Sequence, residues 1–357
     1  MTEPKFILSK GVLLEQVKKL TDLGLKVSYS YKTNREVGKV LQEISDVSFS
    51  IHAREEIKDV SNKGLEASPK AQNSGRQIWF FTQAEREEEL KEILDLGIRH
   101  FVVDNEVDLE RLLKVVDVPI NLSLRMKFRE HRVGTGKYFV YGMSSAKINE
   151  LIERIKGNEF IGRLGVHIHR KSQNVSEWDI VSDLKDSLTE ESLREISFVN
   201  LGGGLPSVYR SSNVEVFDYI FKKLKEARDW LAEKNIETWI EPGRFLAAPC
   251  VKLEAEIIQA YDNNLILNTT IYNCALDNVM TNTKMLVEGE LGKGALGSEF
   301  LIKGDSPTRD DIFRYRVKLV KDIGVGDKIV FLNAGAYNYT TDFFGYKKLK
   351  CEIREEF

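Results

Sequence analysis

The sequence predicts an α/β protein in two parts, a parallel (β/α)8 barrel of the TIM type followed by an all-β domain. Over the first two thirds of the chain, short apolar runs alternate with longer amphipathic runs. A strand followed by a helix, repeated about eight times, is typical of such a barrel. From about Phe245 onward the helical periodicity fades and β-rich runs replace it. We therefore expect the barrel to span residues 12–246 and the β-rich domain to comprise residues 1–11 and 247–357.

The expected barrel strands are short segments rich in apolar and β-branched residues, and amphipathic segments separate them. The strands are Val27–Tyr31, Val47–Ile51, Ile78–Phe81, His100–Val103, Ile120–Arg125, Ile161–His169, Ser197–Leu201 and Thr238–Glu241. Helical patterns between them include Asn34–Ile44, Glu85–Leu96, Val107–Val116, Ser145–Ile155 and Val214–Lys234.

The second domain is expected to be built from β-rich runs joined by turns. A Gly-Val-Gly-Asp segment at residues 324–327 lies between two of these runs and is a turn signal. Phe6-Ile7-Leu8 forms an isolated strand ahead of the first helix, and we expect it to pair with this domain. The runs are Val251–Gln259, Thr269–Cys274, Tyr315–Val320, Lys328–Leu332 and Lys348–Ile353.

Charge and composition argue against several classes of function. The 357 residues are 42% hydrophobic and 30% charged, and the net charge of −3 provides no attraction for nucleic acid or an anionic membrane. Charged residues interrupt the apolar runs between Met1 and Leu20, which predicts neither a signal peptide nor a membrane span there. The 3 cysteines lie far apart and predict no disulfide framework. The cytoplasm is therefore the expected location.

Chemically useful groups fall at or near the ends of expected strands, at Lys32, Arg125, His167, Gly202 and Glu241. In a parallel barrel the carboxyl ends of the strands meet at one mouth, so we expect these residues to lie together. An amine that can form a Schiff base, amides that can hold a phosphate, and a carboxylate that can face a pyridine nitrogen are the parts of a pyridoxal phosphate site. The sequence therefore predicts such a site at the barrel mouth.

The pair of histidines in His167-x-His169 supports a rival interpretation, a metal-dependent hydrolase barrel. Alternate residues of a strand point to one side, so both imidazoles could bind one ion. Such a site requires further ligands at other strand ends. The remaining histidines, His52, His100 and His131, do not form a metal-spaced cluster. We therefore predict no metal site.

Three motifs resemble those of the fold-type III pyridoxal phosphate-dependent decarboxylases, the family of ornithine, diaminopimelate, arginine and carboxynorspermidine decarboxylases. Tyr29-x-Tyr-Lys32-x-Asn resembles the family's Tyr-Ala-x-Lys-Ala-Asn motif, and the Gly-Gly-Gly-Leu-Pro run at 202–206 is similar to its Gly-Gly-Gly-Phe-Pro. Glu-Pro-Gly-Arg at 241–244 follows in the same order as in the family. The resemblance implies an alanine racemase-like fold with pyridoxal 5'-phosphate as the cofactor.

The resemblance also implies a role for individual residues. Lys32 would hold the cofactor covalently, and Glu241 would pair with the pyridine nitrogen. His167 would stack on the ring, and Arg125 would support the inner side of the site. The catalytic residues would thus be Lys32, His167 and Glu241. The phosphate side would be formed by Gly203, Gly204, Gly243, Arg244 and Tyr337.

The chain departs from the family pattern in places that affect the substrate. His169-Arg170 stands where family members often have Gly-Ser, so Arg170 or Ser172 would have to supply that phosphate contact. The segment at 304–311 takes the place of a loop whose cysteine protonates the product in a partner subunit, yet it contains no cysteine. Ser50 replaces an aspartate that ornithine-specific members carry. Candidate contacts for the tail of the substrate are Asp277, Arg309, Asp310 and Asp311.

The predicted function is the pyridoxal phosphate-dependent decarboxylation of a basic or diamino L-amino acid to an amine, as in polyamine metabolism. A homodimer with shared active sites is expected, because the 304–311 loop would complete the site of the partner. One alternative is a diaminopimelate or carboxynorspermidine decarboxylase, which Arg309 would favour by binding a carboxylate. The others are a non-catalytic homologue of the antizyme-inhibitor type and the metal-dependent hydrolase.

Overall fold

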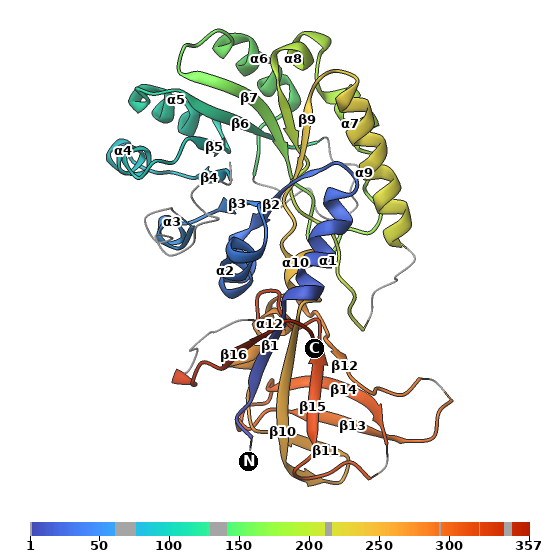
Figure 1. Cartoon of the computed structure of the whole chain (residues 1–357). Coiled ribbons are helices and arrows are strands. Elements are labelled where there is room, and N and C mark those ends of the chain that lie inside the picture. The colour runs from blue at the N-terminus through green and yellow to red at the C-terminus, as the bar shows by residue number, and fades with distance from the viewer. Residues whose placement is uncertain are drawn as a thin grey trace.

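The computed structural model describes residues 2–60, 76–128, 141–210, 216–292, 294–320, 322–338 and 345–357. It consists of a barrel surrounded by helices and a second part built from β-strands, which lies below the barrel in Figure 1. His131, which was considered as a metal ligand above, lies outside the described residues.

The barrel is closed and has eight parallel strands in chain order, as predicted. It closes where β2 pairs with β9, in the register Lys26↔Trp239 and Val27↔Ile240. The strands are β2 (Lys26–Ser30), β3 (Ser48–Ile51), β4 (Ile78–Thr82), β5 (His100–Val103), β6 (Ile120–Met126), β7 (Ile161–Ile168), β8 (Phe198–Asn200) and β9 (Glu237–Ile240).

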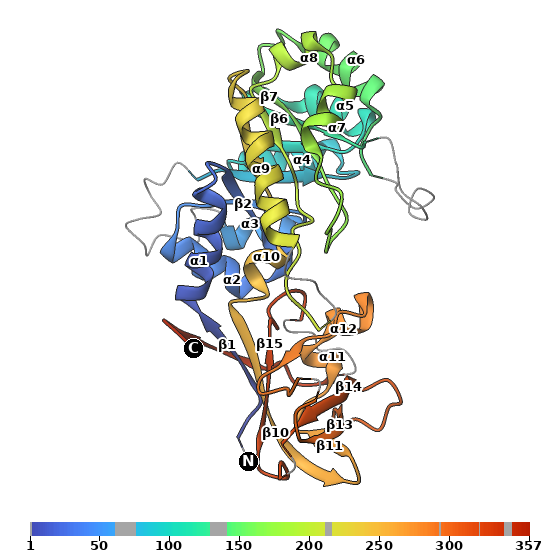
Figure 2. The ribbon, with the colours of Figure 1, turned by 90° about the vertical axis from the view of Figure 1, so that its right-hand side faces the viewer.

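Helices cover the outside of the barrel, and α9 runs along its side in Figure 2. The short helices α3, α7 and α8 were not predicted, because so few residues give little periodicity. Among the described helices, none is long and apolar enough to cross a membrane. The helices are α1 (Lys10–Thr21), α2 (Arg35–Ile44), α3 (Arg54–Val60), α4 (Glu87–Asp95), α5 (Glu106–Val115), α6 (Ser145–Ile155), α7 (Ile180–Ser187), α8 (Glu190–Glu195), α9 (Val216–Ala232) and α10 (Arg244–Ala247).

Aromatic side chains from different strands fill one layer of the barrel interior. Trp79 of β4 contacts Phe198 of β8 and Trp239 of β9, with ring centroids 5.0 and 6.0 Å apart. Gly165 of β7 makes room for this layer, because a Cβ there would collide with the ring of Phe198. This packed layer closes the interior below the carboxyl ends of the strands, so an open cavity remains only toward that mouth.

The second part is an 8-stranded sheet in the order β12-β15-β10-β11-β13-β14, with β1 paired to β10 and β16. The expected strand at Phe6–Leu8 does join this sheet, with Phe6 opposite Leu253 of β10. β1 and β16, near the two ends of the chain, lie side by side (Figure 2). The strands are β1 (Lys5–Ser9), β10 (Val251–Tyr261), β11 (Asn264–Leu267), β12 (Leu286–Val287), β13 (Ser298–Lys303), β14 (Ile312–Leu319), β15 (Lys328–Leu332) and β16 (Lys350–Arg354).

The prediction of a strand at Thr269–Cys274 is wrong. This segment forms the short helix α11 (Ile271–Cys274), which is followed by α12 (Leu276–Thr281). The Thr270 hydroxyl accepts a hydrogen bond from the amide of Tyr272, and the Asp311 carboxylate accepts one from the amide of Ile271. These two caps satisfy amides at the start of the helix, and the second cap comes from a distant loop that β-propensity cannot reveal.

Candidate active site

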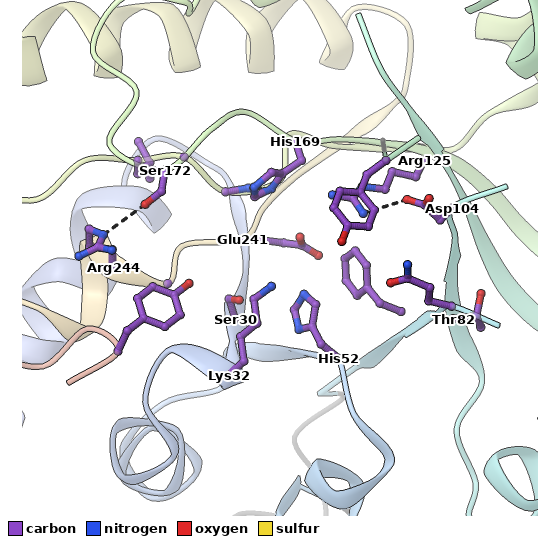
Figure 3. A pocket seen from close by; sticks show the side chains of 18 residues that line it. Ser30, Lys32, His52, Thr82, Asp104, Arg125, His169, Ser172, Glu241 and Arg244 are labelled. Carbon is purple, nitrogen blue, oxygen red and sulfur yellow. Dashed lines mark hydrogen bonds and ion pairs between the residues drawn. The ribbon is translucent and has the colours of Figure 1, made fainter. Parts of the chain in front are cut away.

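A cavity of about 320 Å³ opens at the mouth of the barrel (Figure 3). The residues that form it come from the ends of the barrel strands and from the loop that follows β15. Every expected cofactor-binding residue except His167 lines it. The lining residues are Ser30, Lys32, His52, Phe81, Thr82, Gln83, Asp104, Arg125, Tyr141, His169, Ser172, Gly203, Gly204, Leu205, Glu241, Gly243, Arg244 and Tyr337.

Lys32 projects into this cavity from a 3₁₀ turn, Tyr31–Thr33, that directly follows β2. The side chain is exposed to the cavity, and the protein that forms the cavity wall surrounds its amine. Burial lowers the pKa of the amine, and the nearby Glu241 carboxylate opposes that effect. An amine with a lowered pKa is more often neutral and therefore a better nucleophile toward an aldehyde.

Asn34 fixes the turn that carries Lys32. Its side-chain oxygen accepts hydrogen bonds from the amides of Glu36 and Val37, at 2.9 and 3.2 Å, and so caps α2. Its side-chain nitrogen donates to the backbone oxygen of Gly335 at 2.8 Å. Asn34 thus ties the lysine turn both to α2 and to the loop after β15.

The Glu241 carboxylate lies in the wall of the cavity and is almost fully buried. Oε1 accepts hydrogen bonds from Ser50 Oγ at 2.6 Å and from Asn200 Nδ2 at 2.9 Å. Oε2 lies 2.9 Å from Nε2 of His167. Burial alone would raise the pKa of Glu241, but His167 and the hydrogen bond from Ser50 lower it to about 2. The carboxylate is therefore ionised at neutral pH.

The two histidines of the His167-x-His169 motif occupy different places. His167 has 0% exposure and lies behind Glu241, so it does not line the cavity as expected for a ring-stacking residue. His169 follows the last residue of β7 and exposes its ring to the cavity (Figure 3). Its Nδ1 accepts a hydrogen bond from the amide of Gly203 at 3.2 Å. Burial within the protein, followed by the proximity of His167, lowers the pKa of His169 to about 3.

One end of the cavity is suited to an anion. The backbone of Gly203 and Gly204 lines it, and Gly204 has a φ of +98°, a conformation that favours glycine. Ser172 lies here as well, where its hydroxyl accepts a hydrogen bond from Nε of Arg244 at 3.2 Å. Tyr337 places its ring 5.2 Å from the Arg244 guanidinium. Hydroxyls, amides and a guanidinium in one place are the donors that a phosphate requires.

Arg244 is already paired with Asp277 of α12. Nη2 donates to Oδ1 at 2.8 Å, and Nη1 donates to Oδ2 as well as to the hydroxyl of Tyr209. The hydrogen bond and charge of Asp277 outweigh burial and raise the pKa of the guanidinium. Both oxygens of Asp277 thus accept hydrogen bonds from Arg244, and the expected role of this carboxylate in binding a substrate amine stays a prediction.

Arg125 lies at the other end of the cavity, as expected for a residue that supports the inner side of the site. Its Nη1 donates to Oδ1 of Asp104 at 2.9 Å, and its guanidinium lies 5.1 Å from the centroid of the Tyr141 ring. Asp104 also accepts a hydrogen bond from the amide of Gly142 at 3.1 Å. The charge of Arg125 is therefore compensated within the wall.

The loop at 304–311 lies away from the cavity of its own chain. Asp311 is fully buried, and its carboxylate accepts hydrogen bonds from the amides of Ile271 and Ser306, at 2.9 and 3.0 Å. Asp311 therefore stabilises the loop and is not free to bind a substrate. Arg309 and Asp310 are 90% and 66% exposed and pair with each other. These two remain the only expected substrate contacts with accessible charged groups.

Several residues of the cavity wall were not predicted from the sequence, and His52 and Asp104 are the ionisable side chains at strand ends among them. His52 is the first residue after β3, where its ring stacks on that of Phe81 with the centroids 4.5 Å apart. Burial, followed by the charge of Lys32, lowers the pKa of His52 to about 3. Asp104 is likewise the first residue after β5. The strand-end rule that identified Lys32 applies equally to both of them.

Comparison with known proteins agrees with this geometry. The family model for the pyridoxal-binding domain of pyridoxal-dependent decarboxylases matches residues 13–248. The chain belongs to this family. Pyridoxal phosphate is therefore the cofactor of this barrel, and the predicted recognition is confirmed. Membership also decides against the metal-dependent hydrolase, and among the described residues no group of His, Cys, Asp and Glu side chains could hold a metal ion.

Several relatives are decarboxylases of amino acids. A diaminopimelate decarboxylase of Halalkalibacterium halodurans is 26% identical over 209 residues, which are 52% of this chain but only 48% of that relative. A lysine/ornithine decarboxylase of Selenomonas ruminantium is 22% identical over 275 residues, 74% of this chain and 68% of that relative. The crystal structure of a lysine/ornithine decarboxylase from Vibrio vulnificus, complexed with cadaverine, has a TM-score of 0.77 at 22% identity and covers 99% of this chain and 95% of that one. This likeness confirms the predicted barrel with a β-rich, alanine racemase-like second domain.

Proposed function

We propose that the protein is a pyridoxal phosphate-dependent decarboxylase that converts a basic or diamino L-amino acid to an amine. One observation carries this proposal: Lys32, the buried Glu241 carboxylate and the phosphate end at Gly203, Gly204 and Arg244 line a single cavity. An amine, a ring-nitrogen partner and an anion site are what this cofactor needs from a protein. The names of the two relatives support amino-acid decarboxylation as the reaction.

Different residues of the cavity would hold different parts of the cofactor. Lys32 would hold the aldehyde carbon, and Glu241 would face the ring nitrogen. Gly203, Gly204, Ser172, Gly243 and Tyr337 hold the phosphate, with Arg244 beside them. His169, rather than His167, covers one face of the ring, because His169 alone of the two is exposed to the cavity. This assignment replaces the one made for His167 from the sequence.

Bound pyridoxal phosphate supplies an electron sink for the electron pair that the departing carboxyl group leaves behind. The chain supplies orientation and charge. Glu241, ionised and fixed by three contacts, stabilises a proton on the ring nitrogen. Neutral His169 packs on the ring without adding a positive charge, because its pKa is about 3. Holding ring and substrate rigidly aligns the bond that breaks.

A homodimer would complete the site. Arg309 and Asp310 are exposed and do not line the cavity of their own chain, so they are available to a second copy. The loop contains no cysteine, and the cysteines of the described chain, Cys250, Cys274 and Cys351, do not line the cavity. The proton that replaces CO₂ therefore comes from another kind of group. In the partner's cavity, Asp310 would attract a distal ammonium group and Arg309 a distal carboxylate.

Sharing of sites can be tested by mixing two inactive variants. Lys32→Ala removes the lysine of its own site, whereas Asp310→Ala impairs the site of the partner. In a mixture that has exchanged subunits, one site of each mixed dimer has both residues intact. We expect activity to reappear in the mixture, with a dimeric mass by sedimentation. A monomeric protein with full activity would contradict the shared site.

The substrate is tested by CO₂ release from ornithine, lysine, arginine, diaminopimelate and carboxynorspermidine. We expect lysine or ornithine to react fastest. Lys32→Ala should release no CO₂, whereas Lys39→Ala, which changes an exposed lysine of α2 paired with Glu36, should behave as the wild type. Fastest release from diaminopimelate or carboxynorspermidine would instead assign Arg309 to a substrate carboxylate. No release from any of them by cofactor-loaded protein would refute the decarboxylase.

A further inference from the structure

The Glu241 carboxylate is surrounded by a cage of polar groups contributed by three strands of the barrel. Ser50 comes from β3, His167 from β7 and Asn200 from β8, and all three contact the carboxylate. We propose that Ser50, Asn200 and His167 are positioning residues that keep Glu241 ionised and leave one acceptor site on Oε2 for the N–H of the cofactor ring. The inference rests on the proposed function but concerns the protonation of Glu241 itself.

The direction of the hydrogen bond from Ser50 follows from its neighbour. Ser28 Oγ and Ser50 Oγ are 2.7 Å apart and fully buried, and Ser50 Oγ is 2.6 Å from Oε1 of Glu241. An ionised carboxylate only accepts hydrogen bonds, so the single hydroxyl proton of Ser50 points at Glu241. Ser28 must then donate to Ser50. Such a chain of hydroxyls strengthens the last bond, the one that the carboxylate receives.

The orientation of Asn200 is fixed in the same way. The amide of Gly202 donates to its side-chain oxygen at 2.9 Å, which identifies that atom as the acceptor. The side-chain nitrogen is then free to donate to Oε1 of Glu241 at 2.9 Å. The amide of Glu241 in turn donates to the backbone oxygen of Gly202 at 2.9 Å. Asn200 therefore holds the bend at Gly202 and the carboxylate of Glu241 in a fixed relative position.

His167 donates a hydrogen bond to the carboxylate from Nε2. Its Nε2 lies 2.9 Å from Oε2 of Glu241, while its Nδ1 is buried and has no hydrogen-bond partner among the described residues. A lone pair without a partner costs less free energy in an apolar setting than an N–H of a charged ring without one. The edge of the ring also contacts Phe81, with the centroids 5.1 Å apart. These surroundings select the tautomer with its proton on Nε2.

The cage offsets the cost of burying the carboxylate. Besides Glu241, the ionisable groups that line the cavity include Lys32 from the turn after β2, His52 from the end of β3, Arg125 from β6 and His169 from the end of β7. Asp104, Arg244, Tyr141 and Tyr337 line it as well. Burial keeps His52 and His169 neutral at pH 7, since the pKa of each is about 3. Arg125 is paired with Asp104. The donors of the cage therefore replace most of the lost water.

The number of donors determines what the carboxylate can still accept. A carboxylate offers about four lone-pair positions in its plane. Ser50 and Asn200 occupy those of Oε1, and His167 occupies one of Oε2. One position on Oε2 remains, and Glu241 lines the cavity. The cage thus fixes both the charge of Glu241 and the single direction from which a ring N–H can approach.

The test measures the pKa of Glu241 in the protein without cofactor or substrate. Infrared difference spectra recorded during acidification detect the carbonyl band of a protonated carboxyl group, and Glu241→Gln identifies the band by removing it. We expect His167→Phe and Ser50→Ala each to raise this pKa by about one unit, a tenfold change in the ionisation constant. His167→Gln keeps an N–H donor and should restore most of the shift. An unchanged pKa of Glu241 in both variants would overturn the proposal.

A second measurement uses the loaded enzyme. The pH profile of CO₂ release should show its acid limb at higher pH in His167→Phe than in the wild type, and the visible absorption of bound cofactor should change over the same range. A merely structural role would lower the rate at all pH values without moving the limb. If His167→Phe does not fold, Ser50→Ala and Asn200→Leu carry the same test. If the protein does not decarboxylate amino acids, the infrared measurement still tests whether Ser50, Asn200 and His167 keep Glu241 ionised.

Discussion

Arg244 of the barrel and Asp277 of α12 form a buried bidentate ion pair, with Arg244 Nη2 2.8 Å from Asp277 Oδ1. The side chains are only 4% and 2% exposed. Thr281 donates its hydroxyl to Oδ1 of the same carboxylate at 3.0 Å, and the amide of Asp277 donates to Asn338. The pair joins the phosphate end of the cavity to α12, which lies between strands β11 and β12 of the second sheet. The pairing gives Asp277 a structural role, and the substrate contact expected for it stays a prediction.

Asp277→Asn should destabilise the folded protein more than it affects substrate binding. Arg244 would keep its charge without a buried counter-charge, so we expect the free energy of unfolding in urea to fall by about 3 kcal/mol. Glu36→Gln, which breaks the exposed pair with Lys39, is the matched control and should cost less than about 1 kcal/mol. KM at saturating cofactor should change little in Asp277→Asn. A large rise in KM with unchanged stability would show that Asp277 binds the substrate.

His169→Ala should weaken cofactor binding, whereas His169→Phe should largely retain it. The ring of His169 is exposed to the cavity, and a phenyl ring can replace it as a stacking surface. We expect the Kd for pyridoxal phosphate, from fluorescence titration, to rise about tenfold in the alanine variant, as loss of about 1.4 kcal/mol implies. His167→Ala is the comparison. If His167→Ala weakens binding and His169→Ala does not, the assignment from the sequence was right.

Stability should fall as the pH falls from about 6.5 to about 4, because of His52 and His169. Burial lowers the pKa of each to about 3 from an ordinary value of 6.5. In this interval the unfolded chain takes up protons that the folded chain does not, so acidification favours unfolding. Glu241 has a pKa of about 2, compared with an ordinary value of 4.5, so its protonation lowers the stability of the folded protein only below about pH 4.5. The pH range in which the histidines lower the stability can therefore be separated from the range in which Glu241 does.

Urea unfolding of the cofactor-free protein at a series of pH values would measure this effect. His52→Gln replaces the imidazole by an uncharged amide and should flatten the slope between about pH 6.5 and 4. Glu241→Gln should leave that interval unchanged and flatten the curve only below about pH 4.5. Identical slopes for wild type and His52→Gln would show that His52 is protonated in the folded protein.

The sequence by itself determined the barrel and the residues at its mouth. Alternating strands and helices can bury both faces of a parallel sheet in only a few ways, so the pattern predicts the topology. Once the topology is given, residues that end successive strands must converge, as Lys32, Arg125 and Glu241 do. The short helix α11 (Ile271–Cys274) was missed. Its N-cap Thr270 is local, but the amide of Ile271 donates to Asp311, a contact between segments far apart in the chain.

Only the tertiary structure decided which polar groups pair with one another. Strand alternation places His167 and His169 on one side, but β7 ends at Ile168, so the direction of His169 is set by its loop and by the amide of Gly203. Asp277 and Arg244 are 33 residues apart, and nothing local selects that pairing over a substrate contact. Buried charges take the partners that the fold brings within hydrogen-bonding distance, and those distances are absent from a linear pattern.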